Sequence, residues 1–174
     1  MTDAGLRDAS VESLFERSGA LLDGHFLLKS GRHAGRYLEK FLVLQHPAYG
    51  VELCRRFGEA LAPYRPTLVV GPTTGGVLLA FETARQLGES VRAAFAEPAS
   101  GGGRSLRRGW TVGPDERVVL VDDILTTGAS LIETVEAVRA AGVEPVAAAV
   151  IVDRSGSALE LGFPLHALGR FDVP

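Results

Sequence analysis

The chain has 174 residues, of which 46% are hydrophobic and 22% are charged, and its formal net charge is −3. These fractions are typical of one globular domain, taken here as 1–174, and exclude a disordered or fibrous chain. The negative charge argues against a protein that coats nucleic acid or an anionic membrane. No apolar run is long enough to span a membrane, no signal peptide is visible, and the single Cys54 cannot form an internal disulfide. We therefore expect a cytoplasmic protein.

The first third of the chain predicts two helices separated by extended segments. Ser10 can cap a helix over 11–22, where apolar side chains recur at helical spacing. A short strand that enters a glycine-bounded turn is expected over 24–32, and a further extended segment over 37–44. A helix over 47–62 begins with a proline, which suits the first turn of a helix.

From residue 67 onward, strands alternate with helices. Short apolar runs predict strands over 67–71, 91–96, 117–121 and 146–152, and helices are expected over 75–87 and 130–141, each followed by a glycine. Strands that are apolar throughout and alternate with helices predict a parallel sheet covered on both faces. The glycine- and arginine-rich segment 99–109 interrupts the alternation, and we interpret about 97–109 as a mobile loop inside the domain, of the kind that often forms a lid.

The strongest motif runs from Val118 to Ser130. Four apolar residues predict a central strand with Asp122 and Asp123 at its carboxyl end, where open α/β sheets bind ligands. The hydroxyls and backbone N–H groups from Thr126 onward, together with the start of a helix, suit a phosphate monoester. The acids fit beside a phosphate if they accept hydrogen bonds from ribose hydroxyls with Mg²⁺ nearby. The motif indicates a ribose 5-phosphate site; a βα turn with capping side chains, or a response-regulator-type acidic pocket, is the plainer alternative.

A second glycine-rich turn, Val70–Gly76, also leads from a strand into a helix. Gly75 and Gly76 allow a ligand to approach the backbone closely, and the N–H groups of the turn can face a pyrophosphate. Taken alone, a sharp strand-to-helix turn explains this segment equally well. The chain lacks the usual glycine-rich fingerprints of nucleoside triphosphate and dinucleotide binding.

The motif of residues 118–130 resembles the phosphoribosyl pyrophosphate (PRPP) motif of the type I phosphoribosyltransferases. Leu21–His33, followed by Tyr37 and Leu38, is similar to the amino-terminal region of the orotate phosphoribosyltransferases, and Arg154 matches an arginine that grips the orotate carboxylate there. The resemblance implies the type I phosphoribosyltransferase fold, an α/β fold in which helices flank a central, mainly parallel sheet. It also implies a small hood, formed mainly by residues 1–45 with the C-terminal segment.

The resemblance implies a Mg²⁺-dependent reaction of PRPP with orotate that gives orotidine 5′-monophosphate and pyrophosphate, a step of pyrimidine synthesis. It assigns catalysis to Asp122, Asp123 and Arg104, and orotate binding to Lys29, Tyr37, Leu38, Thr126 and Arg154. It assigns PRPP binding to Lys29, Thr74, Gly75, Asp122, Asp123, Ile124, Leu125, Thr126, Thr127, Gly128, Ala129 and Ser130. Mg²⁺ would be held mainly through PRPP, with Asp122 and Asp123 as further candidate ligands. The resemblance also implies a homodimer with shared active sites, and neither a nucleic acid nor a membrane as partner.

Several alternatives stay open at this stage. Lys29 can be a solvated lysine at a strand end, and Arg154 can belong to a structural ion pair. Many family members carry lysines and a histidine in the mobile loop, where this chain has arginines; Arg104 is the nearest substitute, followed by Arg107 and Arg108, and an exposed basic loop is the plainer interpretation. The rival functions are a purine or xanthine phosphoribosyltransferase and a non-catalytic, PRPP-sensing regulator on the same fold.

Overall fold

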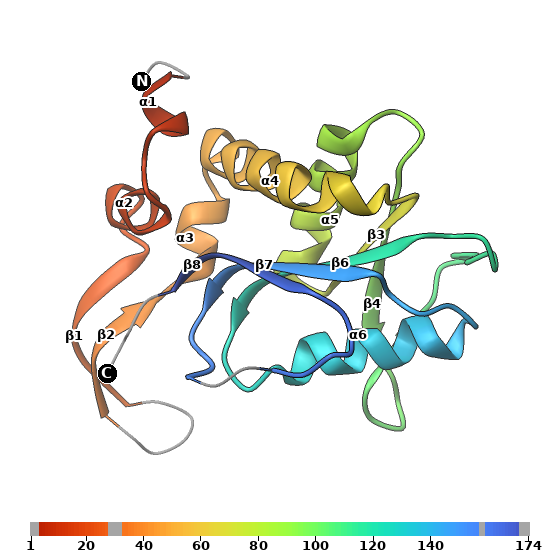
Figure 1. The fold of residues 1–174 in the computed structure, drawn as a ribbon. Helices are drawn as coiled ribbons and strands as arrows, with labels where there is room; N and C mark the ends of the chain where they lie inside the picture. Colours follow the sequence, from red (N-terminus) through yellow and green to blue (C-terminus); the bar gives the residue numbers. More distant parts are fainter. Residues whose placement is uncertain (1–3, 28–32, 157–158, 171–174) are drawn as a thin grey trace.

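The structure is a computed structural model that describes residues 4–27, 33–156 and 159–170 of the chain. A six-stranded sheet with helices on both faces forms its centre, and a two-stranded hairpin lies beside it (Figure 1). Neighbouring strands of the sheet are parallel except for one pair at an edge. The predicted α/β fold with a central, mainly parallel sheet flanked by helices is confirmed.

The strands lie across the sheet in the order β5, β4, β3, β6, β7 and β8. Their bounds are β3 Leu68–Pro72, β4 Arg92–Pro98, β5 Arg104–Leu106, β6 Val118–Leu125, β7 Ala147–Asp153 and β8 Leu165–Arg170. The chain winds outward from β3 to β4 on one side, and from β6 to β7 and β8 on the other. The direction of winding therefore reverses between β3 and β6. Open α/β sheets bind ligands at such a point, beyond the carboxyl ends of the two strands.

Side chains of the central strands alternate between two cores. The helices that cover the sheet are α4 (Pro47–Leu61), α5 (Gly75–Leu87) and α6 (Ala129–Ala140), close to the predicted ranges. Val69 and Val119 belong to the core that includes α4 and α5, whereas Val70 and Leu120 pack with α6 on the opposite face. Both faces of the sheet are thus buried, which is why its central strands are apolar throughout.

The N-terminal part consists of short elements whose buried side chains join the core of α4 and α5. They are α1 (Ala4–Arg7), α2 (Val11–Arg17), β1 (Leu21–Leu27), β2 (His33–Leu38) and α3 (Lys40–Leu44), and a 3-10 turn, η1 (Ala62–Tyr64), follows α4. α2 ends earlier than the predicted helix over 11–22, because Gly19 adopts a φ of 69° and donates its N–H to the Glu16 carbonyl. β1 and β2 then pair as an antiparallel hairpin. That this hairpin and its neighbours act as a hood stays a prediction.

The predicted extended segment over 37–44 is wrong in its second half. The strand β2 ends at Leu38, and the helix α3 follows one residue later. The carboxylate of Glu39 caps this helix by accepting a hydrogen bond from the N–H of Phe41 at 3.2 Å. A short apolar run fits a strand or a helix equally well, and here the cap and the burial of one face decide for the helix.

The interpretation of 99–109 as a segment without regular structure is also wrong in part. The strand β5 pairs antiparallel with β4 through the pairs Ala96–Leu106 and Pro98–Arg104. Gly102 and Gly103 adopt positive φ values in the turn between β4 and β5, which glycine permits because it has no Cβ. The edge strand β8 was not predicted, since its side chains are only half-buried. In the described ranges, no helix has the length and apolar character needed to cross a bilayer.

Candidate active site

The acid pair lies in the central strand at the reversal point of the sheet. β6 continues beyond its four apolar residues, so Asp122 and Asp123 belong to the strand itself, and they are 7% and 3% exposed. Because neighbouring side chains of a strand point to opposite faces, Asp122 turns toward the core of α6 and Asp123 toward that of α5. The start of α5 touches Asp123, since a Cβ on Gly75 would lie 2.1 Å from Asp123 Oδ2.

Asp123 forms an ion pair with a lysine that the sequence analysis did not identify as a site residue. Lys40, the first residue of α3, places its Nζ 2.9 Å from Oδ1, to which it donates a hydrogen bond, and 2.8 Å from Oδ2. The N–H of Ile124 also donates to Oδ1, at 2.7 Å. Oδ2 is buried, and its contact with the Lys40 ammonium is an ion pair without a well-aligned hydrogen bond from the described residues. The rarity of lysine in the chain, with Lys29 and Lys40 as the two examples, was the signal that could have identified Lys40.

The environment of Asp122 disfavours its charge. Burial raises the pKa of Asp122 from 3.8 to about 7, and repulsion from the neighbouring Asp123 carboxylate acts in the same direction. The N–H of Asp123, which donates to Asp122 Oδ1 at 2.8 Å, and the positive charges of Lys40 and Arg104 oppose this rise. Asp122 therefore exchanges a proton near neutral pH, where it can either donate or accept a hydrogen bond.

The loop between β6 and α6 presents hydroxyl groups at the start of a twelve-residue helix. Thr126 and Thr127 are exposed, and the Thr127 hydroxyl accepts a weak hydrogen bond from the N–H of Ala129 at 3.4 Å. Gly128 adopts a φ of 78°, and a Cβ there would lie 2.8 Å from the Leu159 side chain, so glycine is required. The first N–H groups of a helix lack partners within the helix, which makes this loop suitable for an anion.

The other predicted residues of this motif take different positions. Ala129 is exposed and Ser130 half-buried on the first turn of α6. Ile124 and Leu125 pack their side chains into the two cores, so that only their backbone atoms can face a ligand. The carbonyl of Leu125 accepts a hydrogen bond from the N–H of Arg154 at 2.7 Å. That bond ties the end of β7 to the end of β6 and brings Arg154 to the same edge of the sheet.

The turn between β3 and α5 meets the arginine of β5. Arg104 places Nη1 3.1 Å from the Thr73 hydroxyl and 3.1 Å from the Ala96 carbonyl, and its Nε lies 3.4 Å from the Glu133 carboxylate. Thr74 is exposed at the start of α5. A cation therefore lies at the turn that the sequence associated with pyrophosphate, although Arg104 comes from a strand rather than from an irregular loop.

The two further arginines of this segment face other partners. Arg108 donates to the Glu97 carboxylate at 2.8 and 3.0 Å, which forms an exposed ion pair. Arg107 donates to the hydroxyl of Ser105 at 3.1 Å. Among the described interactions of these three arginines, the contact with the β3–α5 turn comes from Arg104.

Three of the predicted orotate-binding residues come from two distant segments of the described chain. Tyr37 and Leu38 lie on β2, and Arg154 follows β7. Tyr37 is 38% exposed on β2, and Leu38 is buried. Burial lowers the pKa of Arg154, and the electrostatic influence of Tyr37 partly offsets this effect. Tyr37 and Arg154 therefore lie within electrostatic range of each other, although 117 positions separate them. Asp153 accepts hydrogen bonds from Ser155 and lies 3.4 Å from Arg170. Lys29 lies outside the described residues.

The protein groups do not by themselves make a complete magnesium site. Carboxylate oxygens such as those of Asp122 and Asp123 are the donors that Mg²⁺ prefers. However, the described parts of the chain hold no group of three or more histidine, cysteine, aspartate or glutamate side chains placed to share a metal. The Lys40 ammonium already lies against Asp123. A Mg²⁺ ion at this edge would need most of its ligands from a bound substrate.

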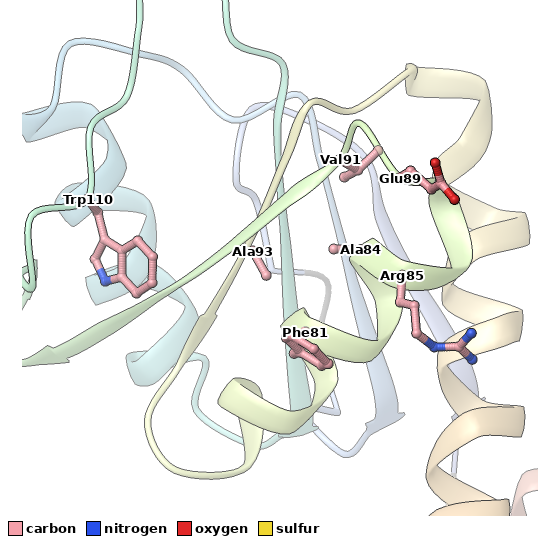
Figure 2. A pocket seen from close by; sticks show the side chains of 8 residues that line it. Phe81, Ala84, Arg85, Glu89, Val91, Ala93 and Trp110 are labelled. Carbon is pink, nitrogen blue, oxygen red and sulfur yellow. The ribbon is translucent and has the colours of Figure 1, made fainter.

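A hollow of about 410 Å³ lies away from these residues. Its walls come from the outer side of α5, from β4 and the turn before it, and from Trp110; Figure 2 shows Phe81 and Arg85 on the helix, with Ala93 on the strand. The ring of Trp110 packs edge-on against Phe95 at 5.5 Å between centroids. None of its lining residues belongs to the acid pair or to the two turns, so it is a separate surface feature.

Comparison with known proteins identifies the family. The model of the phosphoribosyl transferase domain matches residues 53–163. The orotate phosphoribosyltransferase of Pelotomaculum thermopropionicum is 46% identical over 163 residues, covering 94% of this chain and 84% of that protein. The protein of the same name from Thermus thermophilus is 41% identical over 164 residues, with 94% and 88% covered.

A solved structure agrees with these sequence relatives. The crystal structure of orotate phosphoribosyltransferase from Aeropyrum pernix superimposes with a TM-score of 0.76 at 30% identity, and the match covers 91% of this chain and 92% of that one. The matched spans of these relatives include the part of the chain that holds the acid pair and the two turns, since each covers 94% of its length. The chain therefore belongs to the orotate phosphoribosyltransferases, within the type I phosphoribosyltransferase family.

Proposed function

We propose that this chain transfers the phosphoribosyl group from PRPP to orotate, giving orotidine 5′-monophosphate and pyrophosphate in pyrimidine synthesis. A relative that carries the name of this activity is 46% identical over 94% of this chain. The observation that carries the proposal is the convergence at one sheet edge of the acid pair, the two turns and Arg154. Each of these groups suits one part of the two substrates.

The three anionic or polar parts of PRPP have separate partners in this proposal. The loop that begins at Thr126 and the start of α6 bind the 5′-phosphate through hydroxyl and N–H groups. Asp122 and Asp123 accept hydrogen bonds from the ribose hydroxyls. The turn at Thr74 and Gly75, with Arg104 beside it, faces the pyrophosphate. These contacts fix the sugar so that its C1′ is open to attack from one side.

Orotate is held from the opposite side of the sugar. Arg154 grips its carboxylate with a planar guanidinium, while Tyr37 and the backbone at Leu38 wall the ring. Lys29 is proposed to reach PRPP or the base. In the reaction, the bond from C1′ to pyrophosphate breaks and N1 of orotate forms the new bond. No protein nucleophile takes part, so the chain contributes positioning and electrostatic stabilisation.

Mg²⁺ is proposed as the cofactor, carried mainly by the oxygens of PRPP itself. When bound, it would neutralise charge on the pyrophosphate. Asp123 remains engaged with Lys40 in the described structure, and Asp122 is the more weakly compensated acid of the pair. In this proposal the protein residues bind and orient the substrates without first holding a metal ion of their own.

We further propose that the protein is a cytoplasmic homodimer in which segment 97–109 closes over the site. Leu78 and Phe81 on α5 support an interface, since these large apolar side chains are 56% and 68% exposed. Closure would exclude water and limit hydrolysis of PRPP. The hood is proposed to comprise mainly residues 1–45 and the C-terminal segment.

The proposal is tested by a spectrophotometric assay of orotate consumption with PRPP and Mg²⁺. Parallel reactions contain adenine, guanine or xanthine in place of orotate, and a further reaction contains EDTA. We expect turnover of orotate alone, and only with Mg²⁺. Turnover of a purine would identify a transferase of different base specificity. PRPP binding without turnover of any base would identify a regulator.

A further inference from the structure

The contact between Lys40 and Asp123 lies inside the candidate site and is unusually sheltered for an ion pair. The Asp123 side chain is 4% exposed and that of Lys40 is 35% exposed. The Nζ atom approaches both carboxylate oxygens, at 2.9 Å and 2.8 Å. This is the position, facing both oxygens of a carboxylate, that a bound metal ion can also take.

The fold sets the position of Lys40. It is the first residue of α3, whose start is capped by Glu39 and whose buried side chains, Val43 and Leu44, anchor the helix in the core. A methyl carbon of Leu44 also lies beside Gly75, the residue that touches Asp123 from α5. The ammonium is therefore delivered to Asp123 by a packed helix, whereas a long side chain on a free loop would reach it only transiently.

A buried pair of adjacent carboxylates attracts cations, and the chain supplies one of its own. The described residues offer no third acidic, histidine or cysteine side chain to complete a metal site. An ammonium at Asp123 neutralises the charge and also repels a second cation. The same charge acts on Asp122, because Lys40 and Asp123 influence it in opposite senses.

We propose that Lys40 is a positioning residue that serves as the resident cation of this site. It occupies Asp123 and thereby keeps free divalent metal ions off the acid pair. A metal ion then enters only as part of the complex with a polyanionic phosphate ester. That last step rests on the proposed function, whereas the exclusion of free metal does not.

Binding of Mn²⁺ in the absence of any substrate tests the proposal, with free Mn²⁺ measured by electron paramagnetic resonance. The proteins are the wild type, Lys40→Met, Lys40→Arg and the double variant Lys40→Met with Asp123→Asn. We expect no Asp123-dependent binding in the wild type or Lys40→Arg. Lys40→Met should bind Mn²⁺ about tenfold more tightly or better, since a unit charge at contact distance is removed. The double variant should lose this gain.

Arg7→Met is the matched control, because it removes one exposed cation on α1, away from the acids. Equal binding by Lys40→Met and the wild type would overturn the proposal, as would a gain of the same size in Arg7→Met. If Lys40→Met does not fold by circular dichroism, Lys40→Gln replaces it. The wild type compared with Asp123→Asn is a further test, since Asp123-dependent binding by the wild type would overturn the proposal.

The two hypotheses fail separately. An enzyme inactive toward orotate that still shows this Mn²⁺ pattern contradicts the proposed function and leaves Lys40 as the resident cation. Activity toward orotate without any change of Mn²⁺ binding in Lys40→Met supports the function and rejects the role of Lys40.

Discussion

Gly75 and Asp123 are in contact across the reversal point of the sheet. A Cβ added to Gly75 would lie 2.1 Å from Asp123 Oδ2 and 3.3 Å from its carboxyl carbon. The first residue of α5 thus lies against the same carboxylate that the Lys40 ammonium contacts. The turn associated with pyrophosphate and the acid associated with ribose form one packed unit, so a change in either displaces the other.

Gly75→Ala should therefore lower kcat/KM without unfolding the protein. The new methyl group must push the Asp123 carboxylate away from its position, and a small displacement at a reacting centre costs about 100-fold in rate. Initial rates with varied PRPP measure the effect. Gly50→Ala is the control, because a Cβ on Gly50 in α4 meets nothing within 4 Å. Equal kcat/KM in both variants would show that Gly75 has no such role.

Asp122→Asn should change the free energy of unfolding in a pH-dependent way. The stability of the variant relative to the wild type should be higher at pH 8 than at pH 4. The folded-state pKa of Asp122 is about 7, above its ordinary value of 3.8, so the folded state binds the proton more tightly. The stability from this group is full below pH 3.8 and is lost as pH rises through about 7. This loss amounts to at most about 4 kcal/mol.

Urea unfolding at pH 4, 6 and 8 measures this difference in the free energy of unfolding. The asparagine variant cannot titrate at this position, so its advantage over the wild type should grow with pH. Asp115→Asn is the control, since Asp115 is exposed in the loop before β6. A difference between Asp122→Asn and wild type that stays constant with pH would contradict the expectation.

Local signals predicted the part of the site that is continuous in sequence. The helix over 75–87 was predicted with the bounds that it has, because a glycine-rich turn opens it and Gly88 closes it. The acids at the end of β6 were predicted from an apolar run followed by Asp122 and Asp123. Each of these predictions needed only neighbouring residues, together with the rule that parallel strands end at one edge.

The parts that sequence reasoning missed depend on contacts between distant segments. Lys40 and Asp123 are 83 positions apart, and the assignment of 37–44 as extended hid the helix that joins them. Arg104 reaches Thr73 because β5 pairs with β4, and no local propensity of a glycine-rich segment signals that pairing. Periodicity predicts elements but does not specify which side chains meet across the fold.

Arg154→Ala should raise the KM for orotate more than that for PRPP. Loss of a charge-assisted contact to the orotate carboxylate is worth about tenfold or more in KM, whereas the PRPP contacts are unchanged. Steady-state kinetics with each substrate varied in turn measure both constants. Arg154→Lys should not restore binding, because an ammonium cannot form the planar, paired contact. Arg170→Ala, a nearby arginine that is 80% exposed, is the control. Equal effects on both constants would argue against a carboxylate clamp.

Phe81→Asp should convert the proposed homodimer into a monomer. Phe81 is 68% exposed on the outer side of α5, where it lines the hollow together with Trp110 and Ala93 (Figure 2). A charge there opposes burial in any interface. Sedimentation velocity measures the mass in solution. Ile132→Asp, which places a charge on α6 at an apolar residue 41% exposed, should leave the dimer intact. If the wild-type protein sediments as a monomer at every concentration measured, the proposed dimer is contradicted.

The acid pair itself offers the strongest test of the site. Asp122→Asn with Asp123→Asn should abolish PRPP-dependent turnover and PRPP binding by calorimetry, because both ribose acceptors lose their charge. The fold should remain, since asparagine fits the same volume and relieves the repulsion between two buried carboxylates. The control double variant Glu136→Gln with Glu144→Gln also removes two negative charges, from the exposed partners of Arg139, and should keep full activity. Unchanged turnover in the aspartate variant, with a normal far-ultraviolet spectrum, would remove these acids from the reaction and move the ribose site elsewhere.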